Sequence, residues 1–345
     1  MLTTDSIDRS LTVYALAGVS NRLKVLVSGL AVAAATQRRF RMLWPLNAEC
    51  GAGFRALFAN DWDVVDVAAA DVAPLPYVVG WVDQLPDLLA VDDQDVLLGH
   101  DSWLLRPGRF DGHGDLMARS IEYFAQLAPI PVLEDRIVAF KRSYFRSRMI
   151  GVHLRRGDFL RARPDVAGGT EKAIAAVDNF LEQWPDAGVL LCTDDGAPDP
   201  RTGAVRTEGV AQRFADRVGE RLVQDKVRSL DRSRTAAIQD AVVDLWLLKC
   251  TDGIVGTAGS TFTKLALLGR VVPYTLIAEP TAPYGRFRRV ARVIGANRMW
   301  NALRQRGLVR TMPFPALVDY YYRAAARIIG RPGVANRRRI DGQQR

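Results

Sequence analysis

The segment MIGVHLRRGD (residues 149–158) passes from a run of apolar residues directly into a cluster of charged ones. Residues 149–153 are predicted to form a buried strand, because a short apolar run bounded by polar residues is typical of the interior of a parallel sheet. The charges that follow are typical of a binding loop. This arrangement predicts a ligand site at the carboxyl edge of a parallel sheet.

Two further apolar runs are predicted to join the same sheet. Residues 188–192 (GVLLC) lead into Thr193 and two aspartates, and residues 253–256 (GIVG) precede a helical pattern over residues 258–268. Ligands of open α/β sheets bind outside the carboxyl ends of the strands, so the polar residues after these three strands are expected to converge on one crevice. Residues 194–208, rich in Gly, Pro and Asp, are expected to form an exposed loop.

The first third of the chain predicts a second parallel sheet. An apolar run at residues 11–17 is followed by a helical pattern over residues 21–38 and by a second run at residues 40–44, which is expected to stop at Pro45. Strand, helix and strand in this order form a βαβ unit. We therefore predict an α/β fold with a boundary near residue 146, giving an N-terminal domain, a second domain and a basic helical segment with a frayed tail: residues 1–146, 147–280 and 281–345.

The net charge of +9 is concentrated at one end of the chain. Residues 281–345 contain fifteen arginines against Asp319 and Asp341, which gives +13 and leaves −4 for the rest. A mildly acidic body argues against a nucleic-acid partner, and no readout motif accompanies the basic end. An amphipathic pattern at residues 287–306 has two interpretations, a helix packed on the core with its arginines in water or a helix lying on an anionic membrane surface.

Cysteine usage and hydropathy predict a reducing compartment. Cys50, Cys192 and Cys250 are far apart and form no CxxC pair, which suggests neither a disulfide framework nor a metal site. No window of about 18 uncharged apolar residues occurs, and Asp5 and Asp8 stand where a secretory signal would be positive. We expect a cytoplasmic protein, with peripheral contact at the inner face of the membrane as an open alternative.

The adjacent pair Arg155 and Arg156 suggests a division of roles. Successive side chains point to opposite sides of an extended backbone, so one arginine can face a ligand while the other anchors the loop. A guanidinium matches phosphate oxygens and would stabilise a departing diphosphate, and Arg155 is assigned that role. Gly157 would permit a turn, and Asp158 would hold Arg156 or the loop backbone. The alternative is a surface salt-bridge cluster that ends a strand.

The spacing of these residues resembles the H-x-R-R-x-D motif of the fucosyltransferase superfamily, which includes nodulation, core α-1,6- and protein O-fucosyltransferases. His153, Arg155, Arg156 and Asp158 match the motif position by position. The resemblance implies a GT-B arrangement of two Rossmann-like domains that face a cleft. It also implies inverting transfer of fucose, or a related sugar, from a GDP-sugar donor to a hydroxyl of a glycan or glycoconjugate acceptor, without a metal or other cofactor.

Two other segments resemble the same family near its donor site. LAGVSNRL (residues 16–23) is similar to the loop before the first helix, although Val19 and Ser20 replace the usual glycine-rich form, and Asn21 is its candidate binding residue. The segment after residue 192 resembles one whose carboxylate shapes the nucleotide pocket. Asp194 and Asp195 are the candidates there, with a capped loop as the alternative.

A series of residues that begins at Asp244 and ends at Thr261 resembles the family's third motif. The resemblance implies that Asp244 pairs with N1 and N2 of guanine, aided by His153, while Ser260 and Thr261 offer hydroxyl and N–H groups to phosphate. Asp252 lies between them in this motif. The alternative for Asp244 is a polar position on an amphipathic helix over residues 235–249.

A general base for the acceptor hydroxyl has two candidates. Residues 44–58 (WPLNAECGAGFRALF) resemble a segment on the acceptor side of bacterial members, and Glu49 is its only carboxylate. An inverting transfer requires the acceptor hydroxyl to lose a proton, which makes Glu49 and Asp158 the candidates. A solvated loop residue is the alternative for Glu49.

Two rival functions remain open at this point. One is a catalytically inactive protein that binds a GDP-sugar or acts as a membrane-associated scaffold with the same fold. The other is a nucleotide-dependent enzyme unrelated to sugars, such as a phosphatase or kinase. The sequence lacks G-x-x-x-x-G-K-[ST], which disfavours a P-loop kinase.

Overall fold

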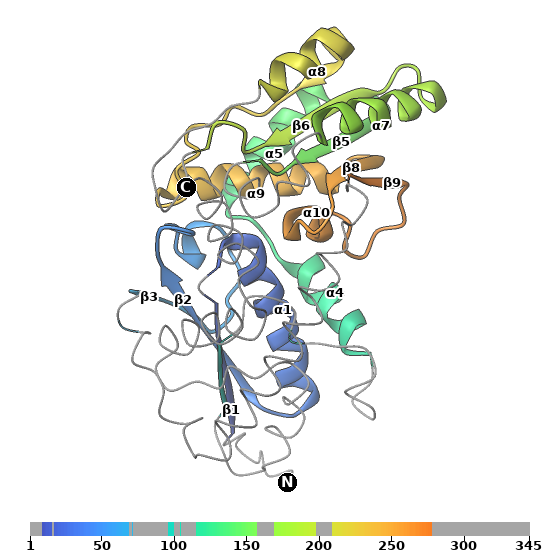
Figure 1. The fold of residues 1–345 in the computed structure, drawn as a ribbon. Coiled ribbons are helices and arrows are strands. Elements are labelled where there is room, and N and C mark those ends of the chain that lie inside the picture. Colours follow the sequence, from blue (N-terminus) through green and yellow to red (C-terminus); the bar gives the residue numbers. More distant parts are fainter. Residues whose placement is uncertain are drawn as a thin grey trace, which may run out of the picture.

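A computed structural model describes residues 9–15, 17–68, 71, 96–99, 104, 115–156, 169–197 and 209–277. Two parallel sheets organise these residues (Figure 1). The first sheet has the strand order β3-β2-β1-β4 and the second has the order β7-β6-β5-β8-β9. Every neighbouring pair of strands is parallel. The predicted α/β class with parallel sheets is confirmed.

The first sheet contains the βαβ unit predicted near the N-terminus. Its strands are β1 (Ser10–Tyr14), β2 (Arg39–Leu46), β3 (Val64–Ala68) and β4 (Val96–Gly99). Helix α1 (Val19–Ala35) connects β1 to β2 and packs against α4 (Leu116–Gln126), and the short 3-10 helix η1 (Phe54–Ala56) follows β2. Most side chains of α1 are buried, because the helix is covered on both sides.

The expected end of β2 at Pro45 is wrong, since the strand continues to Leu46. Proline has no backbone N–H to donate to a neighbouring strand, so it is disfavoured where a strand is paired on both sides. Pairing of β2 with β1 ends at Leu43, whereas pairing with β3 includes Pro45 and Leu46. At Pro45 the strand is therefore paired on one side alone, and proline is tolerated there.

The second sheet contains the strands predicted on either side of the charged motif. They are β5 (Met149–Leu154), β6 (Gly188–Thr193), β7 (Leu222–Val223), β8 (Gly253–Thr257) and β9 (Tyr274–Ile277). The helices are α5 (Pro131–Tyr144), α7 (Gly169–Gln183), α8 (Val210–Val218), α9 (Thr235–Lys249) and α10 (Thr261–Ala266), with the 3-10 turn η4 (Gly219–Arg221) after α8. Helix α9 has the predicted bounds.

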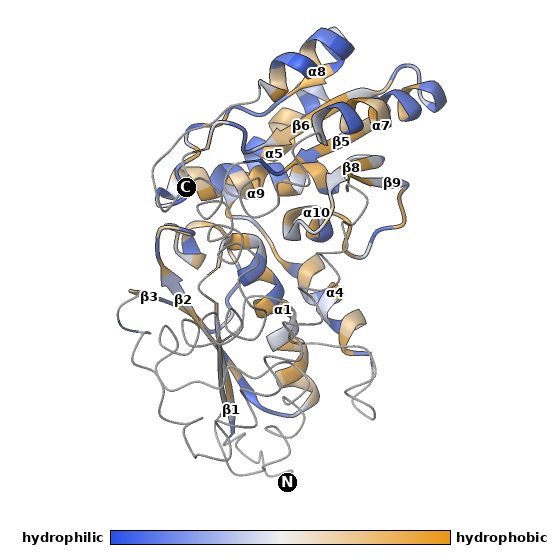
Figure 2. Cartoon of the chain, viewed as in Figure 1, coloured by the Kyte–Doolittle hydropathy of each residue, from blue (hydrophilic) through white to orange (hydrophobic). Residues whose placement is uncertain are grey.

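Helices cover both faces of the second sheet, which explains why its central strands are buried and mainly apolar. Ile150 and Val152 of β5 pack in one core cluster with residues of α7 and α8. Met149 of β5 and Leu190 of β6 belong to the other cluster, which contains most of the buried residues of α9. Figure 2 shows apolar residues along α9 and a polar outer side on α8.

Helix α9 lies between the two sheets (Figure 1) and joins them through aromatic contacts. The Trp246 ring centroid lies 5.6 Å from that of Phe58 and 6.1 Å from that of Phe124 in α4. The Lys249 ammonium lies 4.3 Å from the Phe124 ring centroid, a cation–π distance. Residues of both sheets thus share one core cluster.

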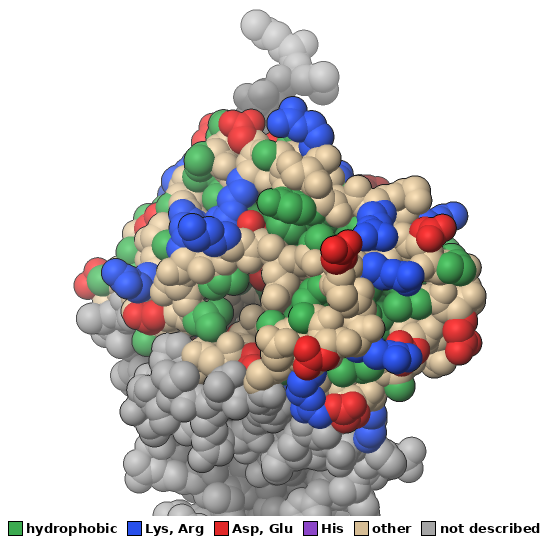
Figure 3. All heavy atoms as spheres, turned by 90° about the horizontal axis from the view of Figure 1, so that it is seen from above, with side chains coloured by type: hydrophobic (Ala, Val, Ile, Leu, Met, Phe, Trp, Pro, Cys, Tyr) green, Lys and Arg blue, Asp and Glu red, His purple; other side chains and the backbone are tan. Residues whose placement is uncertain are grey.

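The described surface carries charges of both signs. Figure 3 shows Lys and Arg side chains interspersed with Asp and Glu over the face that it displays. Among the described helices, none is long and apolar enough to cross a membrane. The basic segment at residues 281–345 lies outside the described residues.

Candidate active site

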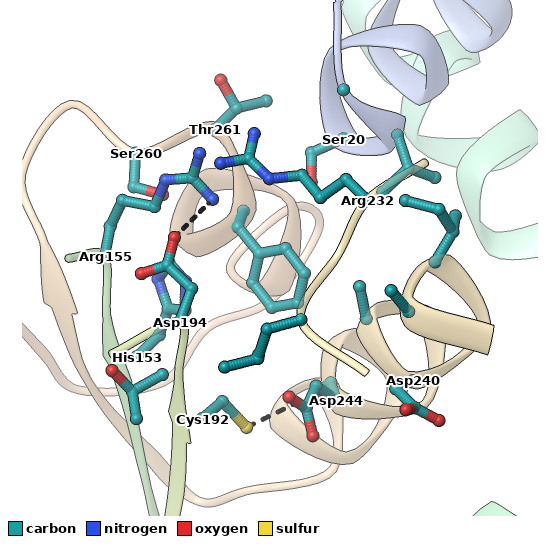
Figure 4. A pocket seen from close by; sticks show the side chains of 18 of the residues that line it. Ser20, His153, Arg155, Cys192, Asp194, Arg232, Asp240, Asp244, Ser260 and Thr261 are labelled. Carbon is teal, nitrogen blue, oxygen red and sulfur yellow. Dashed lines mark hydrogen bonds and ion pairs between the residues drawn. The ribbon is translucent and has the colours of Figure 1, made fainter. Parts of the chain in front are cut away.

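One pocket of about 310 Å³ lies where the carboxyl ends of β5, β6 and β8 face the start of α1 and the loop after β2 (Figure 4). Arg155, Asp194 and Ser260, which follow these three strands, all line it. The predicted convergence of the three strand ends on one crevice therefore agrees with the structure. It arises because β5 lies between β6 and β8 in the sheet.

The two adjacent arginines point in different directions. Arg155 lines the pocket, and its Nη1 atom lies 2.9 Å from Asp194 Oδ2. Its backbone N–H donates to Thr257 Oγ1 at 3.0 Å, which fixes the end of β5 against β8. Arg156 is buried, with 2% of its surface exposed, and Nη2 donates to Thr170 Oγ1 at 2.5 Å. Arg156 thus anchors α7 to the loop and does not line the pocket.

Asp194 is a structural partner of the arginine motif as well as a pocket residue. Its Oδ1 accepts from the Arg156 backbone N–H at 2.5 Å, and its side chain is 17% exposed. The expectation of an exposed loop is therefore wrong at its start, because the carboxylate is held by both arginines. Asp195 instead caps α8, accepting from the Val210 N–H at 3.0 Å, and does not line the pocket.

His153 is a buried, neutral residue at the pocket wall. Burial, together with the smaller effect of the Arg155 charge, lowers its pKa from 6.5 to about 3. Its Nδ1 lies 2.8 Å from Thr263 Oγ1, and its ring stacks on Phe262 with centroids 4.6 Å apart. His153 can therefore offer a hydrogen bond or an aromatic face to a ligand, but no charge.

Asp244 lies at the other end of the pocket from Arg155 (Figure 4). Burial, together with the smaller effect of the negative charge of Asp225, raises its pKa from 3.8 to about 8. Cys192 Sγ lies 3.9 Å from the Asp244 carbonyl oxygen, and burial raises the pKa of this thiol well above its ordinary value. At neutral pH the Asp244 carboxyl is therefore mostly protonated, and neither it nor the neighbouring Cys192 thiol carries a full charge.

Asp240 differs from Asp244 although both belong to α9 and line the pocket. Its Oδ1 accepts from Arg136 Nη1 at 2.6 Å and from Arg228 Nε at 2.8 Å. Its Oδ2 accepts from the Arg228 backbone N–H at 2.6 Å. Asp240 therefore ties the loop before α9 to α5 and is occupied by protein donors.

Ser260 and Thr261 lie at the Arg155 end, where the chain enters α10 (Figure 4). The loop before them turns at Gly259, whose φ of +83° favours glycine. Helical structure therefore begins at Thr261, three residues later than the pattern predicts. Lys24, buried on α1, donates from Nζ to Thr261 Oγ1 at 3.3 Å and links the first sheet to this end of the pocket.

The first sheet contributes Asn21 and Glu49 to the same pocket. Asn21 lies in the first turn of α1, and its backbone N–H donates to Gly18 O at 3.0 Å. Glu49 is exposed, in a turn held by Asn47 Oδ1, which accepts from the Glu49 N–H at 2.9 Å. The aromatic residues of the 44–58 segment are instead buried in the core: Trp44, Phe54 and Phe58.

Some predicted residues are not brought to the pocket. Asp252 lies at the start of β8, where its Oδ2 accepts from the Met149 N–H at 2.8 Å, at the opposite edge of the sheet. Asp158 and Gly157 lie outside the described residues. Within the described residues, no group of three or more His, Cys, Asp or Glu side chains could hold a metal ion.

Two arginines important to the site were missed by sequence reasoning. Arg22 is fully buried, donates from Nε to Ala17 O at 2.6 Å and from Nη2 to Asn47 Oδ1 at 3.1 Å, and so fixes the two first-sheet loops at the pocket. A signal existed, because Arg22 and Lys24 are the only charged residues of a mostly apolar helix. Arg232 lines the pocket from a loop rich in charges, where no pattern distinguishes it from its neighbours.

Comparisons with known proteins agree with this fold. No protein-family model matches the chain. A search of curated protein sequences also finds no match. The crystal structure of fucosyltransferase NodZ from Bradyrhizobium is similar at 17% identity and a TM-score of 0.53, over 79% of this chain and 97% of that one.

Two further solved structures are similar. NodZ α-1,6-fucosyltransferase soaked with GDP-fucose matches at 17% identity and a TM-score of 0.51, over 75% of this chain and 92% of that one. A mutant of Arabidopsis thaliana FUT1 in complex with GDP matches at 12% identity and a TM-score of 0.50, over 79% of this chain and 70% of that one. The chain thus has a fold similar to that of these fucosyltransferase structures.

Proposed function

We propose that this protein is a glycosyltransferase that moves fucose from GDP-fucose to a hydroxyl of a glycan or glycoconjugate. The carrying observation is the polarity of the pocket: Arg155, Ser260 and Thr261 gather at one end and Asp244 lies at the other (Figure 4). Apolar side chains also line the pocket, including Leu230, Ile238 and Phe262. A nucleoside diphosphate has the matching polarity, with an anionic tail and an apolar base that carries donors at its edge.

The proposed chemistry follows from this placement. The bond between C1 of fucose and the β-phosphate oxygen breaks, and Arg155 stabilises the charge that builds on departing GDP. The acceptor oxygen attacks C1 from the opposite face, which inverts its configuration, and its proton passes to Glu49. Asp158 is the second candidate for the base. Ionised Asp244 accepts from N1 and N2 of guanine, which favours guanine over adenine.

The remaining parts of the proposal concern architecture and surroundings. We propose a GT-B arrangement of two Rossmann-like domains, residues 1–146 and 147–280, with the two sheets on either side of the pocket as support. Catalysis is proposed to be metal-independent, with Arg155 supplying the positive charge at the diphosphate. The proposed location is the cytoplasm, and the basic segment at residues 281–345 is proposed to contact anionic lipid.

Calorimetry without added metal tests the donor assignment. The ligands are GDP, GDP-fucose, GDP-mannose, UDP and ADP, and a repeat with EDTA tests metal independence. Preference for guanine nucleotides, and for GDP-fucose over GDP-mannose, supports the proposal. A folded protein that binds no guanine nucleotide contradicts it.

Turnover separates an enzyme from a binding protein. GDP release from GDP-fucose, measured with and without a mixture of glycan acceptors, is expected to increase with acceptor. The variant Glu49→Gln is expected to keep GDP affinity and to lose about 100-fold or more of the acceptor-dependent rate. Tight binding with no acceptor-dependent release would instead support the inactive, sugar-nucleotide-binding alternative.

A further inference from the structure

Arg232 enters the pocket from a different part of the chain than Arg155. It belongs to the loop between β7 and α9 and lines the pocket. In Figure 4 its side chain extends toward the end of the pocket that holds Arg155, Ser260 and Thr261. Two guanidinium groups, one from the end of β5 and one from this loop, thus approach the same end of the pocket.

The backbone around Arg232 is fixed by the loop after β2. The Gly51 N–H donates to the Arg232 carbonyl oxygen at 2.8 Å, and Thr235 Oγ1 donates to the Gly51 carbonyl oxygen at 3.3 Å. A Cβ atom at Gly51 would lie 1.8 Å from the Ser233 carbonyl oxygen, so the two loops touch through bare backbone. This contact between the two sheets determines where Arg232 stands.

The turn that presents Arg232 is also ordered from within. Asp231 accepts from the Ser233 N–H at 3.0 Å and from Ser233 Oγ at 2.7 Å. These bonds lower the pKa of Asp231, so its carboxylate is ionised and engaged with Ser233. The turn is therefore stabilised locally as well as by Gly51.

Two converging cations favour an anionic ligand. Arg155 is ion-paired with Asp194, and a phosphate that enters between the two guanidinium groups would be attracted to both of them. Planar guanidinium groups offer paired donors that match phosphate oxygens. A nucleoside diphosphate bound with its base at Asp244 extends its phosphates toward this end.

We propose that Arg232 is a second phosphate-binding residue, which contacts the terminal phosphate of the nucleoside diphosphate from the side opposite Arg155. This inference rests on the proposed function, because it requires that the pocket bind such a nucleotide. It adds a dependence between the sheets: the loop that carries Glu49 also positions Arg232. Loss of the Gly51 contact therefore weakens phosphate binding although neither arginine side chain is changed.

Calorimetry with GDP and guanosine tests the phosphate contact. Arg232→Ala is expected to weaken GDP binding by about 10- to 100-fold and to leave guanosine binding unchanged, as for the loss of charge-assisted hydrogen bonds. Arg232→Lys keeps the charge and is expected to lose less. Arg234→Ala, an exposed arginine two positions away that does not line the pocket, is the matched control and is expected to bind GDP as the native chain does.

Gly51→Ala tests the positioning of Arg232. It is expected to weaken GDP binding selectively over guanosine, as Arg232→Ala does, and the double variant Gly51→Ala with Arg232→Ala is expected to bind no more weakly than Arg232→Ala alone. Circular dichroism and thermal unfolding confirm that each variant is folded. An equal loss for GDP and guanosine in Arg232→Ala would overturn the inference, because it would indicate a structural effect.

The outcomes distinguish this inference from the proposed function. Native GDP binding that Arg232→Ala leaves unchanged overturns the inference and retains the donor assignment. Arg232-dependent binding of UDP or ADP in preference to GDP supports the phosphate contact and contradicts the guanine assignment. A native chain that binds no nucleotide overturns both.

Discussion

The two ends of the pocket are built in opposite ways. At the Arg155 end, residues from β5, the β8–α10 loop and the loop before α9 meet, so cations and hydroxyl groups come from separate chain segments. At the Asp244 end, Asp240 and Asp244 come from one helix and Cys192 from the adjoining strand. The Arg155 end, which is the proposed phosphate end, therefore depends on how separate segments assemble. The Asp244 end, which is the proposed base end, depends on burial of one helix against one strand. Each end can be broken separately.

The largest effect is expected at the phosphate end, from Arg155→Ala. If Arg155 stabilises the departing diphosphate, GDP release from GDP-fucose should fall by about 100- to 1,000-fold. Arg148→Ala is the matched control, because Arg148 precedes the other end of β5 and pairs there with Asp252. A rate for Arg155→Ala within a few-fold of this control would contradict the role assigned to Arg155.

The next effect is expected at the base end, from Asp244→Asn. An amide offers one acceptor in place of two, so the preference for GDP over ADP should shrink by about 10- to 100-fold, while the diphosphate contacts remain. Calorimetry with both nucleotides measures the ratio. Asp252→Asn, at the opposite edge of the sheet, should leave the ratio unchanged. An unchanged ratio in Asp244→Asn would mean that another group reads the base.

A series of affinity measurements at different pH values tests the role of Asp244 at the same end of the pocket. Asp244 has a pKa of about 8 and is mostly protonated at neutral pH, whereas the proposed guanine contact requires the ionised form. Affinity for GDP-fucose should therefore increase about 25-fold from about pH 6.5 to pH 8.5, in proportion to the ionised fraction of Asp244. GDP-fucose is the suitable ligand because its doubly esterified diphosphate does not titrate in this range. The increase should vanish in Asp244→Asn, and a fall in affinity with increasing pH would contradict the assignment.

The smallest effect is expected from Thr257→Val at the phosphate end. This change removes the acceptor of the Arg155 backbone N–H, which should cost about 1–3 kcal/mol of unfolding free energy and a few-fold in GDP affinity. Thr36→Val, which removes a hydroxyl bond to Val32 O at the far end of α1, is the control for stability alone. Denaturant unfolding and calorimetry together distinguish them. An unchanged GDP affinity in Thr257→Val would mean that this bond does not position Arg155.

The central strands of the second sheet and helix α9 were predictable from sequence because their signals are local. The apolar runs that became β5, β6 and β8 and the periodicity of α9 are continuous in the chain. The general topology of parallel sheets then places the ends of these strands together. Asp194 shows the limit of this reasoning: loop composition predicted exposure, whereas contacts with two arginines hold it in the pocket wall.

The phosphate end was only partly predictable because its assembly is not local. Arg155 follows a strand, and this position is visible in the sequence. Arg232 and Lys24 lie far from Arg155 in the sequence but contribute to the same end of the pocket. Their local sequence patterns do not indicate a contact between the two sheets. Pro45 likewise depends on where its neighbouring strand ends, which sequence alone does not specify.

The contact of Gly51 with Ser233 also limits how the two sheets can move. At this contact, held by the Gly51–Arg232 hydrogen bond, backbone meets backbone, so no long side chain between the two loops can adjust if one loop moves relative to the other. If the two sheets rotate relative to each other during a catalytic cycle, a rotation centred on this contact keeps its hydrogen bond, whereas moving the two loops apart breaks it. The contact then acts as a hinge point, and the loop that carries Glu49 moves together with the turn that carries Arg232.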